Sequence, residues 1–156
     1  MEPRINPYKT APDLMSAMMK LENAVRESGL EKPLVELVRT RASQINGCAF
    51  CLHTHTRDAR ASGETEERLY LLDAWRESSL YTQRERAALA WTEAVTLVAQ
   101  THVPDSVFDE VHSQFDKVEI VKLTLLITTI NAWNRIAIAF RIPHPSSASA
   151  GKTTEA

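Results

Sequence analysis

The residues best suited to chemistry lie in one short segment that holds both cysteines of the chain. Cys48 and Cys51 form a Cys-x-x-Cys pair, and His55 follows four residues after the second cysteine. On a helix, residues three apart have α-carbons roughly 5 Å apart, inside the range that a disulfide needs. The pair can therefore pass between dithiol and disulfide with little backbone motion. This combination predicts thiol redox chemistry.

His55 and Glu36 are candidates for moving the thiol proton. The reactive form is the thiolate, and an ordinary thiol of pKa about 8.5 is only ~3% ionised at pH 7. A helix start favours the thiolate, and His55, one turn after Cys51, can accept its proton. Glu36 would orient His55 if their two helices fold back antiparallel across Asn46-Gly47. On spacing alone, Glu36 is equally a solvated helix acid.

Three other interpretations fit the cysteine pair less well. A zinc site of Cys48, Cys51 and either His53 or His55 lacks the second ligand pair that structural zinc usually has. Two buried cysteines acting as small apolar side chains would not explain a histidine on the same helical stripe. A thioredoxin fold places the motif after a strand, whereas residues 34–45 have helical periodicity. No metal and no bound cofactor is expected.

Helical patterns extend over most of the chain and would position this segment. Glycine is scarce, with 4 residues, and no alternating strand run is followed by a hairpin turn. Capping-box sequences open at Thr82 and Asp116, and the first helix carries a stripe of Leu14, Met18, Leu21 and Val25. We predict an all-α, single-domain bundle of about six to seven helices, with the Cys-x-x-Cys pair starting the third. Helices are expected at about 12–28, 33–45, 48–62, 66–77, from 82, from 104 and from 116 to 141.

Composition and charge narrow the class of protein. The 156 residues fit one domain, expected at 1–141, with a Pro/Ser/Ala/Thr-rich tail at 142–156 that we expect to be disordered. A net charge of −2 argues against nucleic acid or a membrane surface as partner. The start of the chain lacks the apolar core of a secretory signal, which suggests the cytoplasm. The stretch Val118–Phe140 is interrupted by polar residues and predicts a buried helix, apolar on more than one face, so that contact between subunits is expected.

Beyond these patterns, the chain resembles a known family. The run from Glu36 through Asn46-Gly47-Cys48-Ala49-Phe50-Cys51-Leu52-His53-Thr54-His55, then Gly63-Glu64, resembles the core of the alkylhydroperoxidase D family, within the carboxymuconolactone decarboxylase-like superfamily. The run Asn131-Ala132-Trp133-Asn134-Arg135 resembles the family's last helix, so the likeness covers roughly residues 10–141.

The resemblance implies an all-α homo-oligomer, a trimer or hexamer, that works as a disulfide-cycling peroxidase. By motif position, it implies that Glu36, Cys48, Cys51 and His55 are the catalytic residues. In the best-known members a second histidine directly precedes the second cysteine. Phe50 stands at that place, so this chain departs from the family's proton relay there.

Together these observations predict a peroxidase-type thiol oxidoreductase. Cys51, being nearer His55, is expected to attack the hydroperoxide, and Cys48 to close the disulfide and meet the reductant. An external dithiol protein, lipoyl-bearing or thioredoxin-like, would restore the thiols. The alternatives are the decarboxylase or lyase chemistry of the superfamily, which has no use for a dithiol, and a non-catalytic redox-sensing subunit.

Overall fold

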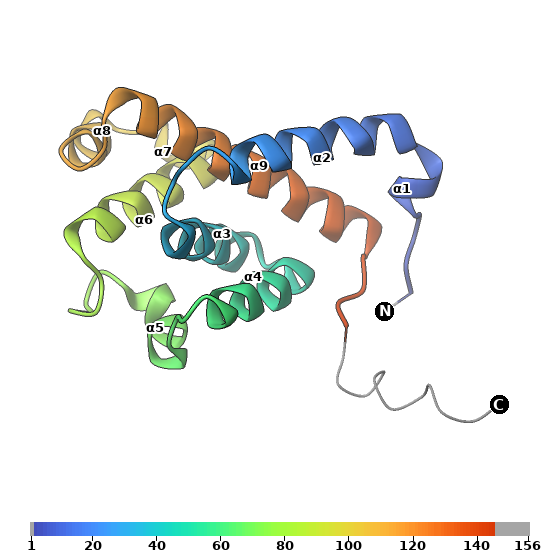
Figure 1. Ribbon diagram of the computed structural model, residues 1–156, viewed down its shortest axis with the longest axis horizontal. Helices are drawn as coiled ribbons and strands as arrows, with labels where there is room; N and C mark the ends of the chain where they lie inside the picture. Colours follow the sequence, from blue (N-terminus) through green and yellow to red (C-terminus); the bar gives the residue numbers. More distant parts are fainter. Residues whose placement is uncertain (1, 146–156) are drawn as a thin grey trace.

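The computed structural model describes residues 2–145, and that part of the chain is helical without a strand. The all-α prediction is confirmed (Figure 1). Two short helices, α1 and α7, were not predicted. Because α1 precedes the others, the Cys-x-x-Cys pair begins the fourth helix of the chain and not the third, as predicted. The elements are α1 (Pro7–Thr10), α2 (Pro12–Arg26), α3 (Lys32–Asn46), α4 (Ala49–Ala61), α5 (Glu66–Leu71), the 3-10 helix η1 (Leu72–Ala74), α6 (Gln83–Thr96), α7 (Val98–Thr101), α8 (Asp105–His112) and α9 (Lys117–Phe140).

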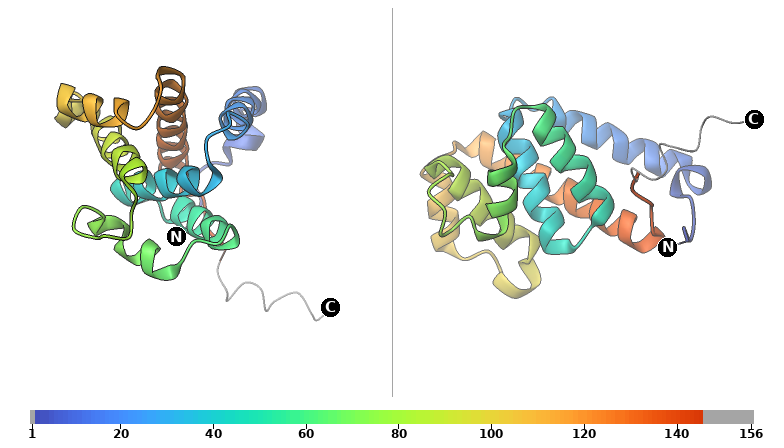
Figure 2. Two further views of the ribbon diagram at one scale, coloured as in Figure 1. Left: turned by 60° about the vertical axis from the view of Figure 1, so that its left-hand side comes forward. Right: turned by 90° about the horizontal axis from the view of Figure 1, so that it is seen from below.

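The turn between α3 and α4 sets the position of the cysteines. Gly47 ends α3 with φ +67°, a left-handed conformation that glycine adopts without the steric cost of a Cβ. Cys48 then caps α4, because its Sγ accepts a hydrogen bond from the backbone N–H of Cys51 at 3.3 Å. The reversal lays α3 and α4 side by side (Figure 2), as a contact between Glu36 and His55 requires.

The main core lies where α9 crosses α2, α3 and α6. Both predicted capping boxes are confirmed, Thr82 with Glu85 at the start of α6 and Asp116 with Glu119 at the start of α9. The core residues are apolar side chains with little or no exposure, and the largest cluster consists of Val25, Leu30, Leu34, Val35, Val38, Ala87, Ala88, Trp91, Val111, Phe115, Ile120, Leu123, Leu126 and Ile127.

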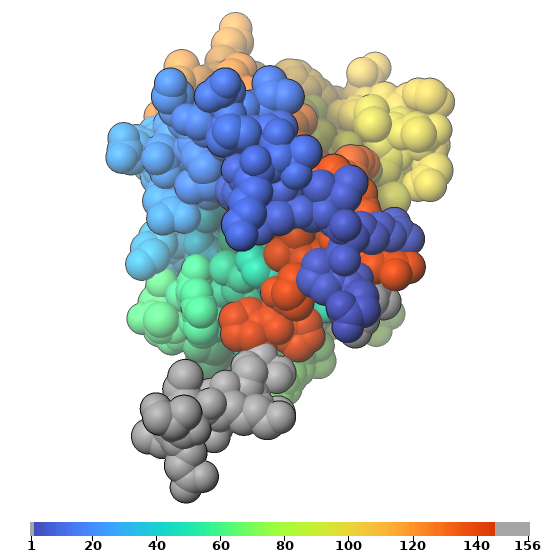
Figure 3. Space-filling model, turned by 90° about the vertical axis from the view of Figure 1, so that its right-hand side faces the viewer, coloured from blue at the N-terminus to red at the C-terminus, as the bar shows by residue number. Residues whose placement is uncertain are grey.

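The stripe predicted for α2 is wrong for two of its four residues, Leu14 and Leu21, whereas Val25 is buried as predicted. Leu14 is 71% exposed and Leu21 is 40% exposed, whereas Met15, Glu22 and Val25 are buried. The reason is an ionic contact: the Glu22 carboxylate binds the buried Arg39 guanidinium, which turns that face of α2 inward. Figure 3 shows α1 and α2 lying across the end of α9. Leu14, Met19 and Leu21 of α2 remain exposed.

The last helix has two different faces. By length and composition alone, α9 is long and apolar enough to cross a membrane, with 24 residues and a mean hydropathy of 1.3. Core helices of soluble proteins share this property, and Leu123, Ile127 and Ile130 are buried within the bundle. Val118 and Val121 are exposed on the other face.

The structure describes only the first part of the C-terminal segment that follows α9. Residues 142–145 are described, and Ile142 packs against the apolar cluster that contains both cysteines. The rest of the tail that we expect to be disordered, 146–156, lies outside the described residues.

Candidate active site

The two cysteines lie together at the start of α4 as free thiols. Both are buried, with 1% of Cys48 and 3% of Cys51 exposed. Cys48 holds the N-cap position, where the free amides and the helix dipole favour negative charge. The sulfur that caps the helix is therefore the one best placed to be a thiolate.

The two thiols differ in acidity because they interact directly. The pKa of Cys48 is lowered to about 7, mainly by the hydrogen bond from the Cys51 thiol. The backbone amides of Cys51 and Phe50 and the side chain of Asn134 lower this pKa further. Burial of the thiol opposes this shift. The pKa of Cys51 is raised, first by its interaction with Cys48 and then by burial. The pair acts as one unit in which Cys48 loses its proton first.

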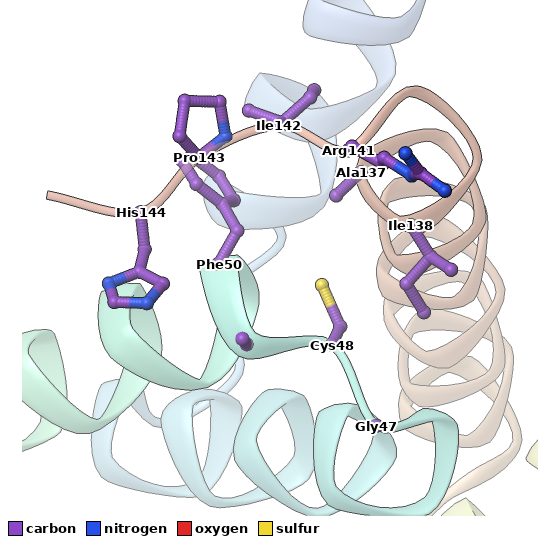
Figure 4. A pocket seen from close by; sticks show the side chains of 10 residues that line it. Gly47, Cys48, Phe50, Ala137, Ile138, Arg141, Ile142, Pro143 and His144 are labelled. Atoms are coloured by element: carbon purple, nitrogen blue, oxygen red, sulfur yellow. The ribbon is translucent and has the colours of Figure 1, made fainter. Parts of the chain in front are cut away.

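Cys48, although buried, also lines a cavity. Its sulfur points into a cavity of about 460 Å³ between the start of α4, the end of α9 and residues 142–144 (Figure 4). The cavity is mainly apolar, and Cys51 does not line it. Phe50, at the position of the family's extra histidine, forms part of its wall. The lining residues are Gly47, Cys48, Ala49, Phe50, Ala137, Ile138, Arg141, Ile142, Pro143 and His144.

Glu36 and His55 meet on the facing sides of α3 and α4. The distance from His55 Nδ1 to Glu36 Oε2 is 2.9 Å, and only 5% of Glu36 is exposed. Because a carboxylate only accepts hydrogen bonds, we assign the proton of the neutral imidazole to Nδ1, which leaves Nε2 as the basic nitrogen. His55 lies one helical turn after Cys51 on α4.

A buried ionic chain behind Glu36 was not predicted. Arg39 Nη1 donates to Glu36 Oε1 at 3.3 Å, and Arg39 Nη2 donates to Glu22 Oε1 at 2.5 Å. The Trp133 indole N–H donates to Glu22 Oε2 at 3.1 Å. The spacing of Glu36 and Arg39, three residues apart on one helix, is a signal that could have indicated the first of these contacts. Nothing in the sequence pattern indicates that Glu22 contacts Arg39 or Trp133.

A group of side-chain amides ties the end of α3 to α9. Asn46 Nδ2 donates to Asn131 Oδ1 at 2.9 Å and to Asn134 Oδ1 at 2.8 Å. Asn134 Nδ2 donates to Ser43 Oγ at 3.1 Å, and Asn134 is fully buried. These bonds place Asn134 beside the cysteines, where it lowers the pKa of both thiols. The asparagines of the α9 motif thus support the start of α4.

The other histidines and acids do not assemble a metal site. Within residues 2–145, no three His, Cys, Asp or Glu side chains come together as a metal ion would need. His53 stacks on His144 with ring centroids 5.5 Å apart, and so faces the segment after α9. A second cavity, of about 440 Å³, borders Glu36 and Arg39 on the side of Arg26 and Lys32.

Comparisons with known proteins show which sequences and structures this chain resembles. Residues 12–94 match the Carboxymuconolactone decarboxylase family. The uncharacterised protein YdfG of Bacillus subtilis is 44% identical over 139 residues, covering 89% of this chain and 95% of YdfG. A crystal structure from Agrobacterium tumefaciens, of a protein of unknown function described as a putative antioxidant defence protein AhpD, superimposes with a TM-score of 0.91. It is 46% identical, and the match covers 94% of this chain and all of that one.

A more distant structure shares the fold. An uncharacterised peroxidase-related protein from a Silicibacter species matches with a TM-score of 0.77 and 22% identity, over 92% of this chain and 76% of that one. At this identity the likeness concerns the helical architecture alone.

The acidity of Cys48 is expected to depend on a hydrogen-bond donor at position 51. In the reduced protein, the rate of Cys48 alkylation by iodoacetamide should rise with pH and reach half its maximum near pH 7, because the thiolate reacts and its pKa is about 7. Cys51→Ala removes the donor and should move the curve to higher pH. Cys51→Ser keeps a donor and should move it less. Mass spectrometry of the Cys48 peptide measures the rate, and identical curves for the Ala and Ser variants would contradict this account.

Removing Arg39 is expected to destabilise the fold. Arg39→Met leaves the Glu22 and Glu36 carboxylates buried without their cation, which should cost about 3–5 kcal/mol of unfolding free energy. Arg39→Lys keeps the positive charge but cannot contact both carboxylates with two separate nitrogens, so it should lower the unfolding free energy by less. Urea denaturation under reducing conditions measures both. An Arg39→Met protein as stable as the parent would show that this ionic chain does not hold the helices together.

Proposed function

Because the chain belongs to the carboxymuconolactone decarboxylase family and has AhpD-like relatives, we propose that it is a thiol-dependent peroxidase that reduces hydroperoxides through a Cys48–Cys51 disulfide cycle. The observation that carries the proposal is the pair of unlike thiols. Cys48 has a pKa of about 7 and opens onto a cavity, and a second thiol lies three residues away to close a disulfide. A nucleophile with a pKa near the working pH combines a large thiolate fraction with good reactivity.

The first step of the proposed cycle takes place at Cys48. Its thiolate attacks the outer oxygen of a hydroperoxide, the O–O bond breaks, and the alkoxide takes up a proton and leaves as the alcohol. Cys48 becomes a sulfenic acid. The sequence favoured Cys51 for this attack because it is nearer His55, but the lower pKa and the cavity both favour Cys48.

The second step uses Cys51. Its sulfur attacks the Cys48 sulfur, the disulfide forms, and the hydroxyl of the sulfenic acid leaves as water with the proton of the Cys51 thiol. Burial raises the pKa of that thiol, so its proton needs a base. We assign this role to His55, with Glu36 accepting the bond from Nδ1 and stabilising the imidazolium that forms. Arg39 and Glu22 are positioning residues that hold Glu36.

Regeneration needs an external reductant. A dithiol protein, lipoyl-bearing or thioredoxin-like, would attack the disulfide at the Cys48 sulfur, which faces the cavity, and leave as its own disulfide. The cycle requires no prosthetic group, and it suits the cytoplasm, where thiols are kept reduced.

We also propose that the protein is a homo-oligomer, a trimer or hexamer, assembled through α2 and α9. Support comes from apolar side chains on the outer faces of these helices: Leu14 is 71% exposed, Val118 62% and Val121 58%. Such exposure is typical of surfaces that are covered by another subunit.

Titration with hydroperoxide tests the proposed cycle. One equivalent of cumene hydroperoxide should remove two thiols rapidly from the reduced protein, and a dithiol should restore them with turnover. Cys51→Ser should still consume one equivalent but stop at a sulfenic acid, which dimedone traps at Cys48. Cys48→Ser should lack the rapid phase. A rapid phase that persists in Cys48→Ser and disappears in Cys51→Ser would show that Cys51, and not Cys48, attacks the hydroperoxide. Slow thiol loss without turnover under any dithiol would instead favour a redox sensor.

His55 is expected to matter most at neutral pH. His55→Ala should slow disulfide closure by about 10²-fold at pH 7, because the Cys51 proton loses its acceptor. At pH 9 the loss should be smaller, because hydroxide is a hundred times more concentrated and can take the proton. Stopped-flow thiol quantification after a hydroperoxide pulse measures the closure step. Equal slowing at pH 7 and pH 9 would exclude His55 as the base.

A further inference from the structure

The cavity at Cys48 has one cationic residue on its edge. Its walls are apolar, formed by the end of α9, by Phe50 and by the two residues that follow Arg141. Arg141 and His144 are the ionisable side chains beside Cys48 in the lining, and no acidic residue is among them. In Figure 4 the Arg141 side chain extends over the end of α9, above Ile138, and the Cys48 sulfur lies lower in the view, on the side of Ala137. A cavity of about 460 Å³ is in the range of small-molecule sites and far exceeds the needs of hydrogen peroxide.

Arg141 occupies a backbone position where glycine is the usual residue. It ends α9 with φ +54°, and the Ile142 N–H bonds back to the Ala137 carbonyl at 2.9 Å, the pattern of a Schellman turn. A side chain in this left-handed conformation carries a steric cost that glycine avoids. An observed backbone outlier beside a reactive group is a reason to look for a role of its side chain.

The Arg141 guanidinium is also available. Within residues 2–145 no side-chain hydrogen bond or ion pair involves it, and the residue is exposed. The arginines of the interior differ, since Arg39 and Arg68 each contact two carboxylates. His144 is already stacked on His53. Arg141 is thus the cation that a ligand in this cavity can reach.

We propose that Arg141 binds the carboxylate of a ligand whose apolar chain fills the cavity and whose reactive group meets the Cys48 sulfur. This inference rests on the proposed function and names its ligand class, an apolar chain with a carboxylate. Two sources fit this chemistry. One is an acidic organic hydroperoxide, which gives its outer oxygen to the Cys48 thiolate and leaves as the hydroxy acid. The other is an acidic dithiol, whose thiolate attacks Cys48 in the disulfide, releases Cys51 as a thiol and then closes its own disulfide.

A test that needs no turnover compares two alkylating agents that differ in charge. The ratio of Cys48 alkylation rates with iodoacetate and iodoacetamide should fall about two- to five-fold in Arg141→Gln, as expected for one exposed charge contact. Using the ratio cancels any change in the Cys48 pKa. Arg141→Lys should keep the ratio, and so should Lys32→Gln, which removes an exposed positive charge at the start of α3, at the other end of that helix from Gly47 and outside the cavity lining. The difference should shrink in high salt. An unchanged ratio in Arg141→Gln at low salt would overturn the proposal.

Matched ligand pairs then separate the two sources. The first pair is a fatty-acid hydroperoxide and its methyl ester, and the second is dihydrolipoate and dihydrolipoamide. Arg141→Gln should raise KM for the acid of one pair several-fold and leave its neutral partner unchanged, which identifies whether oxidant or reductant carries the carboxylate. If neither acid is affected, the ligand assignment is wrong. If the parent protein turns over no hydroperoxide while the alkylation ratio still falls, the peroxidase proposal fails and the carboxylate site stands.

Discussion

The burial of the Arg39 guanidinium between two carboxylates is the interaction on which the arrangement of helices depends. Arg39 on α3 contacts Glu36 on its own helix and Glu22 on α2, and Glu22 accepts the indole N–H of Trp133 on α9. Burying these charges is costly, and the cost is offset only when every partner is in place. The contacts therefore specify how α2 and α9 sit against α3. They also fix one oxygen of Glu36, which leaves the other to hold His55.

The chemistry of the thiols follows from one helix start. Cys48 caps α4 with its sulfur and receives the Cys51 N–H, so the atoms that begin the helix also stabilise negative charge on Cys48. The same proximity raises the pKa of Cys51. Two chemically identical side chains thus acquire different acidities from their positions in a single turn, and no external charge is needed to tell them apart.

Local patterns predicted much of this structure, and long-range contacts account for what they missed. The capping boxes at Thr82 and Asp116 and the break at Gly47 act within a few residues, so their sequence signals were sufficient. Helices α1 and α7 have four residues each, too short for a periodic pattern. The stripe on α2 failed because an acid that looks solvent-facing pairs with an arginine 17 residues away. The contact between Glu36 and His55 could be expected from the turn. The cavity could not, because its walls come from residues 47–50 and 137–144, two segments far apart in the sequence.

The left-handed residue that ends α9 directs the following chain across the mouth of the Cys48 cavity. The wall contributed by Ile142, Pro143 and His144 is consequently encoded almost a hundred residues after the reactive cysteine. Substitutions there can change the shape of the cavity while leaving the two cysteines and His55 untouched. In proteins that share the cysteine motif, reactivity and selectivity can therefore change independently. The segment around the cysteines determines reactivity, and the segment after α9 determines selectivity.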